Sequence, residues 1–210
     1  MSIVEHPELH LAFAVFAVLA GLVAPVLVHR QRFGRSPVVL FGAADSVHRR
    51  TGLSIAALGL AWGAALATAA CSPAFRNSHK GAPIVMVPAA VSWSLAIGGL
   101  ALLVAAQATM GEAWRIGQDP AKPPAQLCTA GLHRFSRHPI YLGASACLLG
   151  MTLWWPSGFL DLCFVAIVVG LHTLALDEER FLRGRFGDRF AAYARRVPRF
   201  VGLPRRAPLL

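Results

Sequence analysis

Apolar runs of about 20 residues recur along the chain, and short polar clusters separate them. A helix of that length crosses the hydrocarbon of a bilayer, and it satisfies its own backbone hydrogen bonds there. We therefore predict an all-α, polytopic integral membrane bundle. The spacing predicts about five spans, at residues 9–28, 53–71, 84–106, 139–155 and 159–176.

The last two predicted spans form an antiparallel hairpin, because only the tight turn Pro156-Ser157-Gly158 joins them. After the fifth span, apolar residues continue at helical spacing, which predicts a C-terminal amphipathic helix. Gly187 is a potential break in that helix. The stripe consists of Leu182, Phe186, Phe190, Tyr193 and Val197. We divide the chain into an N-terminal membrane part, residues 1–106, and a catalytic part, residues 107–210.

Charge placement fixes an expected orientation. The chain is 56% hydrophobic and only 14% charged, with a net charge of +10. Of its 20 Lys and Arg residues, 18 fall in segments that five spans place on one side of the membrane. By the positive-inside rule that side is cytoplasmic and the N-terminus is outside. The basic residues then line a membrane face, so we expect no nucleic acid partner.

Metal binding is not indicated either. The four cysteines have no CxxC spacing, and neither Cys nor a carboxylate joins His133 and His138 at ligand spacing. At the end of the fourth span, Trp154 and Trp155 are typical of an interfacial aromatic belt. His172, within the fifth span, is either a proton acceptor facing a cavity or a partner between helices.

Two polar clusters lie where hydrocarbon is expected to begin. Charged side chains are costly there, so these clusters are candidates for a functional site. Arg137 and His138 precede Pro139, which suits the first turn of a helix and leaves its amides, beside Arg137, as an anion site. The second cluster runs over residues 177–180. The topology brings both clusters to the same mouth of the hairpin.

Helical spacing separates the two glutamates of the second cluster. It places Glu179 on the face of the apolar stripe and Glu178 at its edge. The first cluster has a purely structural alternative, in which Arg134, Arg137 and His138 only anchor a span at the lipid headgroups. For the second cluster, the alternative is an interfacial helix on which Glu179 pairs with Arg183 at i+4. Arg115 similarly is either a substrate contact or an ordinary basic residue of an inside loop.

Four motifs in order resemble membrane methyltransferases related to isoprenylcysteine carboxyl methyltransferase and phospholipid N-methyltransferases. Residues 137–143, RHPIYLG, are similar to R-H-P-x-Y-x-G, and residues 178–182, EERFL, to E-E-x-x-L. Residues 186–193 match F-G-x-x-[YF]-x-x-Y, and residues 197–200, VPRF, look like the V-P-R ending. Residues 111–117, GEAWRIG, are similar to G-x-S-W-R-I-G of bacterial members.

The resemblance implies S-adenosylmethionine at the cytoplasmic end of the last two spans. A site at the hydrocarbon boundary favours a lipid-like acceptor, with membrane lipids as surroundings, and the compact form of the chain favours a bacterial inner membrane. The resemblance also implies catalytic roles for Glu179, Arg137 and Arg115. Relatives that methylate a prenylcysteine carboxylate often carry an arginine shortly before the double glutamate, and this chain has none there, which leaves the acceptor open. The expected cofactor-binding residues are Gly131, Leu132, His138, Pro139, Tyr141, Gly143, Glu178 and Glu179.

One alternative function belongs to a different reaction class. NADPH-dependent membrane reductases of the sterol and steroid type have a similar R-H-P-x-Y-x-G hairpin. The double glutamate and the V-P-R ending favour the methyltransferase.

Overall fold

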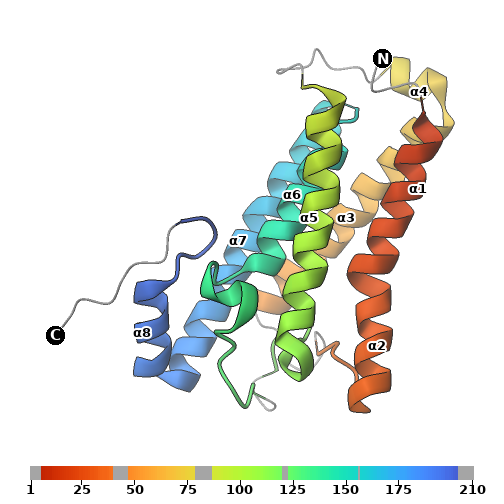
Figure 1. Ribbon diagram of the computed structural model, residues 1–210. Coiled ribbons are helices and arrows are strands. Elements are labelled where there is room, and N and C mark those ends of the chain that lie inside the picture. Colours follow the sequence, from red (N-terminus) through yellow and green to blue (C-terminus); the bar gives the residue numbers. More distant parts are fainter. Residues whose placement is uncertain (1–5, 40–46, 79–86, 120–122, 156, 203–210) are drawn as a thin grey trace.

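The computed structural model describes residues 6–39, 47–78, 87–119, 123–155 and 157–202 (Figure 1). Within these ranges every regular element is a helix, apart from one isolated bridge between Val38 and Ile116. Four helical stretches are long and apolar enough to cross a membrane: Pro7–Phe33, Val47–Cys71, Ala89–Ala113 and Gly158–Phe186. The protein is therefore a polytopic helical membrane protein, as the sequence predicted.

The first span is one continuous helix made of three segments. The π-helical segment Leu19–Val23 links α1 (Pro7–Val18) to α2 (Ala24–Phe33). It ends just before Pro25, whose ring clashes with the preceding turn and which has no N–H to donate. A wider turn accommodates such a residue. Gly34, with φ of 68°, ends α2 in the left-handed conformation.

The second and third spans are α3 (Val47–Cys71) and α5 (Ala89–Met110). A short helix, α4 (Pro73–Ser78), follows α3, and a 3₁₀ turn, Gly111–Ala113, extends α5. The predicted boundaries of these spans are reproduced to within a few residues. Part of the predicted third span, residues 84–86, lies outside the described residues.

The predicted fourth span is shorter than expected. Helix α6 (Pro139–Thr152) has 14 residues, which makes it about 21 Å long at the α-helical rise. It is apolar, but hydrocarbon is about 30 Å thick. The fifth span, α7 (Gly158–Phe186), has 29 residues and continues through both glutamates to Gly187. The structure thus contains four full-length apolar helices and one shorter one, among the residues it describes.

Helices α5 and α6 pack with their backbones in contact at three glycines. A Cβ atom at Gly99 would lie 2.3 Å from the amide nitrogen of Cys147, and one at Gly150 would lie 2.4 Å from that of Ala96. At Gly143 it would lie 2.6 Å from the amide nitrogen of Leu103. Small residues permit such close helix crossings in membranes. Gly143, expected to bind the cofactor, is therefore the position where the backbone of α5 comes close to α6.

The two tryptophans after α6 are buried, so the interpretation as an interfacial belt is wrong. Trp154 is 1% exposed and Trp155 is 7% exposed. The start of α1 packs beside them: the His10 ring lies 4.5 Å from that of Trp154 and 5.1 Å from that of Trp155. Trp93 of α5 completes the cluster, with its ring centroid 4.7 Å from that of Trp154. Neighbouring helices bury these rings, which hydropathy along one segment does not reveal.

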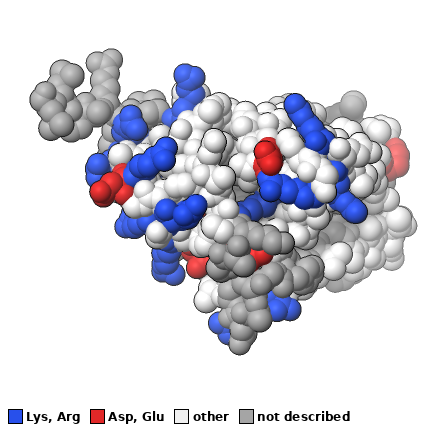
Figure 2. Space-filling model, turned by 90° about the horizontal axis from the view of Figure 1, so that it is seen from below, with Lys and Arg blue, Asp and Glu red and all other residues white. Residues whose placement is uncertain are grey.

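The opposite end of the bundle is basic. Helix α2 ends there, α3 begins there, and α7 and α8 (Asp188–Arg196) meet there (Figure 1). Figure 2 shows Lys and Arg side chains gathered on this end, seen from below. Gly187, with φ of 51°, breaks the helix as anticipated, and α8 turns back beside α7. The whole apolar stripe nevertheless packs into one cluster, with Leu127: Leu182, Phe186, Phe190, Tyr193 and Val197.

Candidate active site

The start of α6, the last turns of α7 and the segment after α8 converge at the basic end. His138 is the N-cap of α6, the two glutamates lie on α7, and Arg199 follows α8. His138 lies 3.3 Å from Glu179 and 3.6 Å from Glu178. The two polar clusters identified in the sequence therefore meet, as the hairpin topology predicted.

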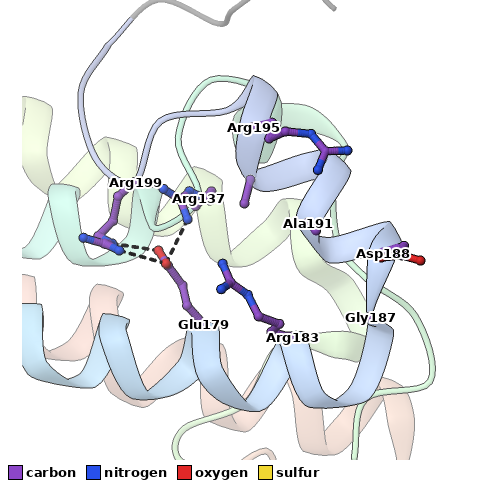
Figure 3. A pocket seen from close by; sticks show the side chains of 9 residues that line it. Arg137, Glu179, Arg183, Gly187, Asp188, Ala191, Arg195 and Arg199 are labelled. Carbon is purple, nitrogen blue, oxygen red and sulfur yellow. Dashed lines mark hydrogen bonds and ion pairs between the residues drawn. The ribbon is translucent and has the colours of Figure 1, made fainter.

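Glu179 is the most heavily engaged side chain of this group, and it is 7% exposed. Its Oε1 accepts a hydrogen bond from Arg199 Nε at 2.8 Å and lies 3.3 Å from His138 Nε2. Its Oε2 accepts from Arg199 Nη2 at 2.9 Å and pairs with Arg137 Nη1 at 2.8 Å (Figure 3). The two parallel bonds from Arg199 are the strong, bidentate form of an arginine–carboxylate pair.

This arrangement confirms the helical phase predicted for the two glutamates. Glu179 is buried, whereas the side chain of Glu178 is 32% exposed. The alternative pairing of Glu179 with Arg183 is absent among the described residues, because the carboxylate is taken by three partners from outside its own helix.

Backbone hydrogen bonds hold the residues after α8 against the start of α6. The N–H of Arg137 donates to the carbonyl of Pro198 at 2.9 Å, and the N–H of His138 donates to that of Arg199 at 3.1 Å. The hydroxyl of Ser136 also donates to the Arg199 carbonyl, at 3.2 Å. The amide of His138 is therefore already bonded, and the Arg137 guanidinium pairs through Nη1 with the chain's own Glu179 carboxylate.

Arg199 was not among the site residues expected from the sequence, although it belongs to the V-P-R ending. Its hydrogen bonds to Glu179 raise the pKa of its guanidinium. Burial lowers the pKa of the Arg137 guanidinium, and the Glu179 charge partly offsets that effect. Arg137 Nε is buried without a hydrogen-bond partner among the described residues.

A second set of side chains surrounds Glu178. The Tyr141 hydroxyl donates to Glu178 Oε2 at 3.2 Å. The rings of His138 and Tyr141 are parallel, with their centroids 5.4 Å apart. The Arg115 guanidinium lies 5.7 Å from the centre of the Phe181 ring, and burial lowers its pKa while the Glu178 charge opposes this. Two predicted site residues, His138 and Tyr141, therefore lie against the more exposed glutamate, and Arg115 packs on the same helix.

Three further predicted residues, Gly131, Leu132 and Pro139, shape the backbone just before and at the start of α6. Gly131 begins a 3₁₀ turn, Gly131–Arg134, with φ of 55°, and a Cβ there would lie 2.7 Å from the Thr109 side chain of α5. The carbonyl of Leu132 accepts backbone bonds from Phe135 and Ser136. Pro139 is buried at the first turn of α6.

The loop between the first two spans also reaches this end of the molecule, on the side where the charge distribution placed it, but no sequence signal indicated its contacts there. His48 of α3 lies 3.3 Å from Asp177, next to the double glutamate. Arg35 forms an ion pair with Glu112 at 2.8 Å, and the bridge between Val38 and Ile116 holds the segment that carries Arg115. His172, a further polar residue of α7, lies with its ring centroid 5.7 Å from that of Phe200.

In the described part of the chain, no group of three or more His, Cys, Asp and Glu side chains could hold a metal ion. Comparison with known families identifies one match: a model of the phospholipid methyltransferases matches residues 87–189. These residues include α5, α6, α7 and the start of α8. None of the curated proteins compared with the chain matches it.

Proposed function

We propose, from the premise that the chain belongs to the phospholipid methyltransferase family, that it methylates an apolar or amphipathic, lipid-like acceptor at the basic end of the bundle. Family membership makes the protein a membrane enzyme that uses S-adenosylmethionine. A site beside hydrocarbon suits an acceptor that enters laterally from the bilayer.

The approach of Tyr141 and His138 to Glu178, with Arg115 packed on Phe181 about one turn further along α7, is the observation that carries the proposed location of the cofactor. The amino acid part of the cofactor is zwitterionic, and here a cation and a partly exposed carboxylate lie over the same part of α7. We assign the cofactor's amino group or ribose hydroxyls to Glu178 and its carboxylate to Arg115. The donor set therefore fits the group.

The cofactor supplies a methyl group that its sulfonium already activates, so the protein chiefly has to align the partners and exclude water. We propose that the paired rings of His138 and Tyr141 form one wall of the site, with the backbone at Gly131 and Leu132 nearby. In this proposal Pro139 and Gly143 have structural roles: Pro139 starts α6, and Gly143 lets α6 pack closely against α5.

We assign Glu179 and Arg137 positioning roles. Glu179 holds His138, Arg137 and Arg199 at once, so it fixes the start of α6 against α7. Its four carboxylate contacts leave less capacity for a ligand than Glu178 has.

The same proposal includes a topology. We propose that α6 and its flanking residues cross as a fifth span, that the basic end faces the cytoplasm of a bacterial inner membrane, and that the N-terminus lies outside. The gathering of Lys and Arg on one end supports this orientation (Figure 2). Residues 107–210 would hold the catalytic machinery, and residues 1–106 would support it.

Calorimetric titration of the purified protein with S-adenosylhomocysteine tests the cofactor site. We expect saturable binding, weakened about tenfold by Glu178→Gln and Tyr141→Phe, since each removes a charged or hydrogen-bonding contact. Asp161→Asn is the matched control, because it is the same carboxylate-to-amide change in the first turn of α7, away from the site. Stabilisation by NADPH in place of S-adenosylhomocysteine would favour the reductase and refute the proposal.

Mass spectrometry of membrane lipid extracts tests the acceptor. We expect one lipid class to gain a methyl group when the protein is expressed, and to lose that gain with Glu178→Gln.

A further inference from the structure

A cavity of about 530 Å³ lies between the last turns of α7 and one face of α8 (Figure 3). Its volume is in the range of small-molecule sites. Four arginines line it, two of which, Arg137 and Arg199, are the partners of Glu179. The full lining is Arg137, Glu179, Arg183, Gly187, Asp188, Ala191, Ala194, Arg195 and Arg199.

The cavity carries more positive charge than its own carboxylates neutralise. Glu179 and Asp188 oppose the four guanidinium groups, so two positive charges are left over. Neither Arg183 nor Arg195 forms an ion pair among the described residues. They approach from different helices, Arg183 from α7 and Arg195 from α8 (Figure 3).

Two further features favour an anion inside the cavity. Arg137 Nε is a buried donor without a partner among the described residues, and an unsatisfied buried N–H costs free energy. The cavity also includes Gly187 and Asp188, where α8 begins. No side chain caps that helix start, and the positive end of a helix dipole attracts anions.

We propose that this arginine cavity is a binding site for a phosphate group, separate from the cofactor site around Glu178. A phosphate opposes the excess positive charge: a monoester carries a charge of about −1.5 to −2, and the diester of a lipid headgroup carries about −1. Guanidinium groups bind its oxygens through paired N–H donors, which lysine does not offer. The headgroup of an anionic membrane lipid and a soluble phosphate ester are the two possible sources of this group.

The Glu179 carboxylate separates the two sites. Its arginine partners face the cavity, while His138 connects it to Glu178. Among the described residues, Arg183 and Arg195 form no hydrogen bond or ion pair with the Glu178 group, so we expect changes at these two arginines to leave the proposed cofactor site intact. The phosphate site can therefore be tested independently of the proposed function.

The test uses the full chain in neutral detergent and the double variant Arg183→Gln/Arg195→Gln. Glycerol 3-phosphate is the soluble probe, titrated by calorimetry at constant ionic strength. The lipid probe is phosphatidylglycerol in phosphatidylcholine nanodiscs, with binding followed by native mass spectrometry. The matched control is Arg185→Gln/Arg189→Gln, which removes the same charge from the same two helices at positions that do not line the cavity.

We expect the cavity variant to weaken binding of at least one probe about tenfold or more, and the control variant to change it less than about twofold. Loss confined to the lipid probe identifies a headgroup as the source, and loss confined to glycerol 3-phosphate identifies a soluble ester. S-adenosylhomocysteine affinity should stay at the wild-type value in both variants.

Three results would overturn the proposal: no binding of either probe to the wild type, equal losses in the cavity and control variants, or loss of S-adenosylhomocysteine binding in the cavity variant. The last result would make the cavity part of the cofactor site. Failure of the proposed function is a different result, in which the wild type itself binds no S-adenosylhomocysteine.

Discussion

Replacing Glu179 by Gln should destabilise the protein more than any other single carboxylate change at the basic end. The substitution keeps the size of the side chain but removes its charge and half of its acceptor capacity. Arg137, Arg199 and His138 would then lose their common partner at a side chain only 7% exposed. Removing one member of a buried ion pair costs about 3–5 kcal/mol, because the other member stays buried and unpaired.

The lower end of that range applies, because the side chain of Arg199 is 33% exposed and can reach water. A loss of about 3 kcal/mol corresponds to a fall in Tm of about 6–12 °C for a chain of this size. The assay is thermal unfolding in detergent, followed by tryptophan fluorescence.

Glu178→Gln is the matched control for this experiment. It removes the charge of a partly exposed side chain but keeps an oxygen that can accept from the Tyr141 hydroxyl, so we expect a loss of about 1 kcal/mol or less. A double-mutant cycle with Arg199→Gln should give a coupling of about 1 kcal/mol or more between positions 179 and 199. Equal Tm values for Glu179→Gln and Glu178→Gln, with no coupling, would refute the reasoning.

Three further predictions follow from packing, protonation and a buried hydroxyl. Gly99→Ala should lower stability by about 1–3 kcal/mol, because its Cβ would lie 2.3 Å from the backbone of α6. The adjacent Gly98→Ala, with nothing within 4 Å, should be neutral or slightly stabilising, and similar Tm losses for both would contradict the close crossing. Burial, and then the His138 charge, lowers the pKa of His133 from 6.5 to about 4. Between these two pH values the unfolded chain therefore binds more protons than the folded one, and the free energy of unfolding should fall by roughly 3 kcal/mol as pH drops from 6.5 to about 4. His133→Gln should flatten this pH dependence of stability. An unchanged pH profile in that variant would argue against His133 as its cause. Tyr193→Phe should lower the free energy of unfolding by about 1–3 kcal/mol in a denaturant titration, because the buried His133 carbonyl loses a 2.6 Å hydrogen bond. A loss no larger than that of an exposed substitution would show that water replaces the lost hydroxyl.

Much of the fold was predictable, because hydropathy and helical spacing report directly on burial. The four long spans follow from the length of the apolar runs, and the inward direction of Glu179 follows from the helical period. The break at Gly187 follows from the presence of a glycine within an otherwise helical pattern. The meeting of the His138 and Glu179 clusters followed from alternation of spans, which needs no knowledge of side-chain packing.

The features that sequence reasoning missed depend on contacts between distant segments. Arg199 lies 20 residues after Glu179 and reaches it only because α8 turns back and the following backbone pairs with residues 137 and 138. His48 meets Asp177 across two helices. The error about Trp154 has the same origin, since its burial depends on His10 and Trp93, which lie far away in the chain.

The pairing of residues 198 and 199 with the start of α6 has a consequence for biosynthesis. Ribosomes make every described helix before Arg199, so the membrane bundle can insert while Glu179 still lacks its bidentate partner. The basic end is therefore completed last, after insertion, when residues 198 and 199 pair with the start of α6. A chain released early, just after Val197, would contain every described helix and still lack one of the two guanidinium groups that pair with its buried carboxylate.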